Sequence, residues 1–160
     1  MRMKRSTLLP AAAAALLLLA ACGEDRGRVA ARQLVRRNSC IASELALDAK
    51  ERLASLDTAV AVAQGTQMEQ VTVASRTFAA AYRQWADAVS RGSDYADSAA
   101  FARSHEDSVR FARQAAQARP RPVDRGTVEG NAAARFNDDF SRAFGNPDHP
   151  CNKPRGRNGS

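Results

Sequence analysis

The stretch that decides the fold spans residues 64–91 and reads QGTQMEQVTVASRTFAAAYRQWADAVSR. Its mostly apolar residues recur at spacings that alternate between three and four: Met68, Val71, Ser75, Phe78, Tyr82, Trp85 and Val89. This alternation is the seam of a helix that packs against other helices. An aromatic stripe of this kind is typical of a helical core. We therefore predict a core helix over residues 67–91, with its three aromatic residues at the centre of the seam.

A second helix is predicted upstream, over residues 29–64. Good helix formers dominate this segment, and its apolar residues recur at helical spacing: Leu34, Ile41, Leu45, Ala49, Leu56 and Val60. Gly65 has the position of a helix C′ residue. The sequence Thr66-Gln67-Met68-Glu69 then predicts a capping box for the core helix. Stop and start signals this close together indicate a tight helix–helix turn.

Two more helices are predicted downstream. Gly92 and Ser93 have the pattern of a helix end followed by a new N-cap, which predicts a third helix over residues 94–119. The proline-rich segment 119–126 then reads as a linker. Apolar residues at every fourth position predict a short fourth helix that Gly145 and Pro147 end: Val128, Ala132, Phe136, Phe140 and Phe144.

Short connections require neighbouring helices to be antiparallel. The predicted fold class is therefore all-α: an antiparallel three-helix bundle of long helices, with the short fourth helix packed on it. This bundle domain covers residues 29–145, and residues 146–160 are predicted to be a flexible basic tail because they are polar and rich in Pro and Gly.

The first residues have the three parts of an export signal. Arg2, Lys4 and Arg5 are basic, the run from Leu8 to Ala21 has no charge, and the run ends in Leu19-Ala20-Ala21-Cys22. A run of this length falls short of the roughly 20 residues that span a bilayer as a helix. A transmembrane anchor, or a plain secretory signal cut near Ala21, is the alternative interpretation.

The segment Leu19-Ala20-Ala21-Cys22 resembles the lipobox of bacterial lipoproteins, and this resemblance covers residues 1–22 only. It implies that residues 1–21 are a signal peptide. It also implies that Cys22 carries a diacylglyceryl group and further acyl chains, and that residues 22–28 are a lipidated tether. Two or more acyl chains hold a protein firmly on a membrane. Gly23 in place of Asp after the cysteine favours the periplasmic face of the outer membrane, if the source is Gram-negative.

The leader contains three of the 24 basic residues and none of the 17 acidic ones, so the remaining chain has a formal net charge of +4. Nearly all of its cations are arginines, which suit phosphate-bearing partners such as anionic lipid head groups. Acidic residues are interspersed throughout, which favours solvated helix faces instead. No recognition motif indicates binding of nucleic acid.

Two cysteines, Cys40 and Cys151, remain after removal of the leader and lipidation of Cys22. Export places them in an oxidising compartment, where a pair is usually joined. We therefore predict a disulfide, whose stabilisation in the chain-entropy model is at most about 4–5 kcal/mol. A buried free thiol is the alternative for Cys40.

The sequence offers no motif for catalysis. His105 and His149 are the only histidines, and neither belongs to a haem-attachment or di-iron motif. The segment Asp148-His149-Pro150-Cys151 is a weak zinc motif, because it lacks a partner pair and an oxidised Cys151 cannot be a ligand. We expect no cofactor, no metal and no enzymatic activity.

These observations favour a lipid-anchored cell-envelope lipoprotein that acts as a non-catalytic binding or adaptor protein. Its partners would be the membrane, through the anchor, and an envelope protein or polymer. The alternative is a helical-bundle carrier of a metal, haem or small apolar ligand. A secreted enzyme inhibitor is a third class.

Overall fold

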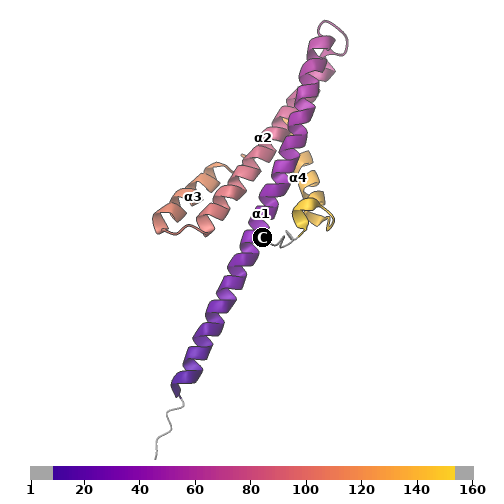
Figure 1. Ribbon diagram of the computed structural model, residues 1–160. Helices are drawn as coiled ribbons and strands as arrows, with labels where there is room; N and C mark the ends of the chain where they lie inside the picture. The colour runs from indigo at the N-terminus through magenta and orange to yellow at the C-terminus, as the bar shows by residue number, and fades with distance from the viewer. Residues whose placement is uncertain (1–8, 154–160) are drawn as a thin grey trace, which may run out of the picture. The chain divides into compact units, whose positions relative to one another are not determined.

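The computed structural model describes the backbone of residues 9–153 and the side chains of residues 27–153. It contains four α-helices and one short 3₁₀ turn (Figure 1): α1 (Leu9–Ala63), α2 (Glu69–Ala100), α3 (His105–Gln117), α4 (Val128–Gly145) and η1 (Pro150–Asn152). The all-α class is confirmed, as a long helix pair with shorter helices. No helix within the described residues is long and apolar enough to cross a membrane.

Contacts divide the chain into two units, Met1–Leu34 and Val35–Ser160. In the first unit α1 begins at Leu9, upstream of the predicted start at Val29, and it includes the predicted tether at residues 22–28. Ala, Leu, Glu and Arg are strong helix formers, which outweigh two isolated glycines. The packing described below belongs to the second unit.

The turn between α1 and α2 closely follows the sequence prediction. Gly65 has φ +74°, the left-handed conformation that a C′ glycine adopts at no steric cost. The Glu69 carboxylate accepts a hydrogen bond of 2.8 Å from the Gly65 amide, and the Thr66 hydroxyl accepts one of 3.2 Å from the Met68 amide. The predicted capping box itself does not form, because the N-cap of α2 is Met68, whose side chain makes no capping bond, and α2 begins at Glu69 rather than Gln67.

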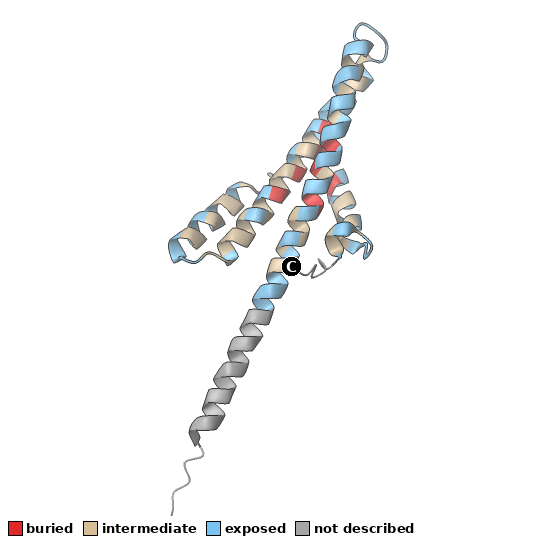
Figure 2. Cartoon of the chain, in the orientation of Figure 1, coloured by how far each residue is buried: buried red, intermediate tan, exposed pale blue. Residues whose placement is uncertain are grey.

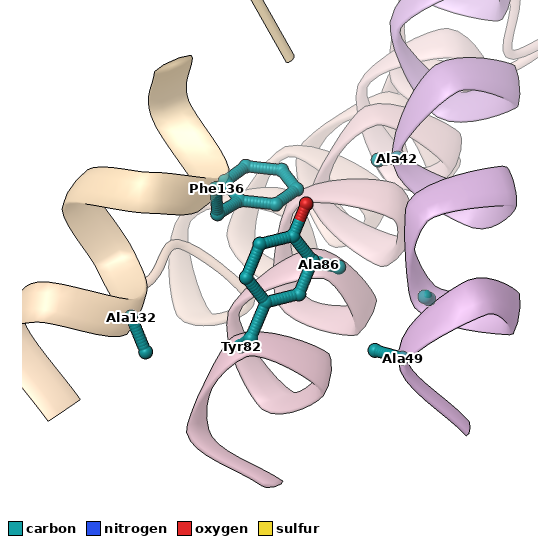
Figure 3. Packing of buried hydrophobic residues seen from close by; sticks show 7 residues of the cluster. Ala42, Ala49, Tyr82, Ala86, Ala132 and Phe136 are labelled. Atoms are coloured by element: carbon teal, nitrogen blue, oxygen red, sulfur yellow. The ribbon is translucent and has the colours of Figure 1, made fainter. Parts of the chain in front are cut away.

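The core is built mainly from alanines, with a few large side chains between them (Figures 2 and 3). The buried cluster joins α1, α2 and α4 through Ala42, Ala46, Ala49, Tyr82, Ala86, Ala132 and Phe136. Small side chains let helix backbones approach closely, so a core with few large residues can still be dense. The Tyr82 and Phe136 rings meet edge to face, with centroids 5.7 Å apart.

Only part of the predicted aromatic seam belongs to the buried cluster. Tyr82 is buried, whereas Phe78 and Trp85 are half-buried against the cluster. Met68 and Val71 are exposed, because the cluster lies further along α2 and leaves its first turns uncovered.

The prediction that a helix ends at Gly92 was wrong, since α2 continues to Ala100. A Cβ placed on Gly92 would lie 3.8 Å from the Ala115 carbonyl oxygen and 3.9 Å from the Ala118 Cβ, so this glycine is where the end of α3 approaches α2. The connection falls instead at residues 101–104. Ser104, not Ser93, is the N-cap of α3, because its hydroxyl accepts from the Asp107 amide at 3.1 Å. The predicted third long helix is therefore shorter.

The prediction for the fourth helix is confirmed, since α4 runs from Val128 to Gly145. The Thr127 hydroxyl caps it by accepting from the Gly130 amide at 3.0 Å. The beginning of the predicted flexible tail is ordered, because η1 is tied to α4 by the Asn152 side-chain amide, which donates to the Ala143 carbonyl at 2.9 Å. Residues 154–160 lie outside the described residues.

Candidate functional site

A groove of about 620 Å³ lies where α1, α2 and α4 meet, directly beside the buried cluster. Most of the residues that one helix contributes are three, four or seven positions apart, so they share one side of that helix. The lining residues are Leu45, Asp48, Ala49 and Arg52 of α1, Phe78, Ala79 and Tyr82 of α2, and Arg135, Asp139 and Arg142 of α4. We call this the arginine groove.

Asp139 organises one wall of the arginine groove. Its Oδ2 accepts from Nε of Arg135 at 3.0 Å and from the Tyr82 hydroxyl at 3.1 Å, and its Oδ1 is paired with Nη2 of Arg142. Arg135 and Arg142 lie four residues before and three residues after Asp139, so one turn of α4 on each side supplies a cation. The carboxylate thereby fixes two guanidinium groups at the rim.

Tyr82 has a hydroxyl whose pKa is clearly shifted by its surroundings in the groove. Burial raises the pKa of its hydroxyl, and the neighbouring Asp139 carboxylate raises it further. Both effects disfavour the phenolate. Tyr82 therefore stays protonated at neutral pH and acts as a hydrogen-bond donor, not as a base or nucleophile.

The rim of the arginine groove carries more positive than negative charge. Three arginines face two aspartates, and Asp139 is already shared by two of these arginines. Arg52 forms no ion pair with a carboxylate among the described side chains. The floor beneath contains apolar side chains such as Leu45 and Phe78. The groove thus combines a net positive charge with apolar surface, which suits a partner with both an anionic and an apolar part.

The polar part of the groove lining consists of arginines, aspartates and one tyrosine. None of its lining residues is a Ser, Thr, Cys or His. Of its two aspartates, Asp139 is held by two arginines and a tyrosine.

The structure brings the predicted cysteine pair together at a second location. The sulfur atoms of Cys40 and Cys151 lie 2.06 Å apart, at disulfide bonding distance, with 5.8 Å between the Cα atoms. Arg37 stabilises the same junction. Its guanidinium donates hydrogen bonds to the Asn152 side chain and to the Phe144 carbonyl, and it lies 3.8 Å from the centroid of the Phe144 ring. The end of α4 is thereby fastened to α1.

The two histidines lie apart. His105 is exposed at the first residue of α3. His149 lies beside the cysteine pair, where its Nε2 is 3.3 Å from a carboxylate oxygen of Glu44. The side chain of Cys22, the predicted lipidation site, lies outside the described residues. Comparison of the chain with family models, curated proteins and solved structures finds no match.

Reasoning from the sequence missed the arginine groove and the position of Glu44. The spacing of Arg135, Asp139 and Arg142 was a local signal that these side chains share a face of α4. Nothing in the sequence showed that Arg52 would lie opposite them, because this depends on how α1 and α4 pack.

Proposed function

We propose that this protein is a lipid-anchored lipoprotein of the cell envelope that acts by binding rather than by catalysis. The observation that carries the binding role is the arginine groove, with its cationic rim and its apolar floor. The similarity of Leu19-Ala20-Ala21-Cys22 to a lipobox supports the anchor, which would be attached at Cys22.

The groove indicates the chemistry of the partner. A guanidinium forms paired hydrogen bonds with the two oxygens of a carboxylate or phosphate, and it loses less hydration than an ammonium group when a partner covers it. Arg52 is available for such a contact, while Arg135 and Arg142 are held by Asp139 at the opposite wall. We infer that the partner is an envelope protein or polymer that presents an acidic group next to an apolar segment.

A carrier of a small ligand is the second candidate. The volume of about 620 Å³ lies within the range of small-molecule sites, roughly 300–1,000 Å³. The same residues would then bind a small apolar molecule with an acidic head group. No observation favours haem, because His105 is exposed on α3 and does not line the groove.

Photo-crosslinking in native membranes tests the binding role. A photo-reactive residue in place of Ser55, which is exposed on α1 three positions after Arg52, should yield an adduct of discrete mass with an acidic partner. Arg52→Gln should reduce the yield about tenfold, since a hydrogen bond to a charged group contributes roughly 1.5–3 kcal/mol. Arg113→Gln, exposed on α3, is the matched control and should leave the yield unchanged. Equal yields from both variants, with unchanged circular dichroism, would exclude the arginine groove as the binding site.

A further inference from the structure

Four side chains with metal-binding chemistry meet where the end of α4 returns to α1. The Sγ atoms of Cys40 and Cys151 and a carboxylate oxygen of Glu44 all lie within 4.8 Å of one another. His149 adjoins this group through its 3.3 Å contact with Glu44. The cluster is distant in sequence, since 111 positions separate the cysteines, and no local motif marks it.

Helical register explains why two of these four side chains lie together. Cys40 and Glu44 are four residues apart on α1, so their side chains project from the same face, one turn from each other. The other two residues flank the start of η1. The Cys151 amide donates to Nδ1 of His149 at 3.3 Å, which makes Nδ1 an acceptor.

This hydrogen bond sets the tautomer of the imidazole. With Nδ1 as acceptor, the proton of the neutral ring is on Nε2, the nitrogen that faces Glu44. His149 can therefore donate to one carboxylate oxygen while Glu44 retains lone pairs for another partner. Outer histidine–carboxylate contacts of this kind orient metal ligands.

We propose that reduction of the disulfide converts this cluster into a zinc site with Cys40, Cys151 and Glu44 as ligands. His149 orients Glu44, and a water molecule takes the fourth position. Thiolate sulfur and carboxylate oxygen are both ordinary zinc ligands, and three protein ligands with one water form a common tetrahedral arrangement. In the oxidised protein both sulfurs are bonded to each other, so the site exists only in the reduced protein.

The conversion needs a two-electron reductant, such as a pair of thiols. Two reductant thiols lose two electrons and two protons and form a disulfide of their own, while the Cys40–Cys151 bond is broken and each sulfur gains one proton. Binding of Zn²⁺ then displaces both protons, because only thiolates are zinc ligands. Cys40 is exposed, which gives a reductant access to the bond.

Zinc titration of the reduced chain tests the proposal. The full-length chain with Cys22→Ser retains Cys40 and Cys151 as its only cysteines. After reduction with a phosphine and its removal without oxygen, competition with a chromophoric chelator should show one Zn²⁺ per chain. Glu44→Gln should weaken binding at least tenfold, and His149→Asn should weaken it about 10- to 100-fold. Glu51→Gln on the same helix and His105→Asn on α3 are matched controls and should bind as the parent chain does.

The variants distinguish a built site from simple binding to two thiols. Equal zinc affinity of the parent chain and Glu44→Gln would overturn the proposal, and so would a reduced parent chain that stays helical without binding zinc. If reduction unfolds the chain, addition of Zn²⁺ should restore its helical circular dichroism, because binding to a folded site stabilises the fold. Failure of zinc to restore it would equally refute the site.

Discussion

The Tyr82 hydroxyl donates a hydrogen bond of 3.1 Å to Oδ2 of Asp139, which joins the buried core to the arginine groove. The ring of Tyr82 packs against Phe136 in the core, while its hydroxyl contacts the carboxylate that holds Arg135. The position of the groove is therefore tied to the packing of α2 against α4. A substitution of Tyr82 should therefore alter both the packing of α2 against α4 and the position of the groove.

The pH dependence of Tyr82 is the first prediction. Burial and Asp139 raise its pKa in the folded protein above the ordinary value of 10.0. The protonated hydroxyl therefore contributes fully to the free energy of unfolding below about pH 10, the pKa of tyrosine in the unfolded chain. This contribution is lost as the pH rises towards the pKa of Tyr82 in the folded protein. The chain has two tyrosines, so Tyr95→Phe leaves Tyr82 as the only one. Its phenolate absorbance should rise at higher pH in the folded protein than in urea, and coincident curves would contradict the buried hydrogen bond.

The second prediction concerns the large core residues. Phe136 is almost fully buried, with 1% of its surface exposed, so Phe136→Ala should cost about 3–5 kcal/mol of unfolding free energy. Trp85 is only half-buried, and Trp85→Ala should cost less, about 2 kcal/mol. Urea denaturation followed by circular dichroism measures both. A larger loss at Trp85 than at Phe136 would show that the core is centred elsewhere.

A pair of helical glycines gives the third prediction. Gly92→Ala should stabilise the protein by about 0.5–1 kcal/mol, because the added Cβ meets only ordinary contacts and alanine is the better helix former. Gly130→Ala should destabilise it, because its Cβ would lie 1.8 Å from the Asp124 carbonyl oxygen and 2.9 Å from the Arg125 Cα. Opposite shifts in melting temperature are expected, and a stabilising Gly130→Ala would show that the linker does not cross α4 at this point.

The sequence predicted those elements whose signals are local. The extent of α4 follows from its apolar repeat and its terminal glycine, and the turn at Gly65 follows from one left-handed residue. The end of α2 could not be predicted, because the pattern at Gly92 and Ser93 resembles a helix stop. There α2 continues through the glycine instead, and the end of α3 packs beside it.

The candidate sites also differ in whether they could be predicted from the sequence. The cysteine pair could be predicted from the number of cysteines and the expected compartment alone. The arginine groove could not, because Arg52 and Asp139 are 87 positions apart and meet only through the crossing of α1 and α4. Glu44 was likewise indistinguishable from other exposed acids until the end of α4 was placed next to it.

The most direct test of the proposed function is the intact mass of the protein extracted from membranes of its native host. We predict loss of residues 1–21 and added mass of a diacylglyceryl group and acyl chains on the fragment that begins at Cys22. The Cys22→Ser variant should lose both the added mass and the membrane association. If this variant is still cleaved at the same bond and remains on the membrane, or if the native chain carries no acyl mass, the protein is not a lipid-anchored lipoprotein.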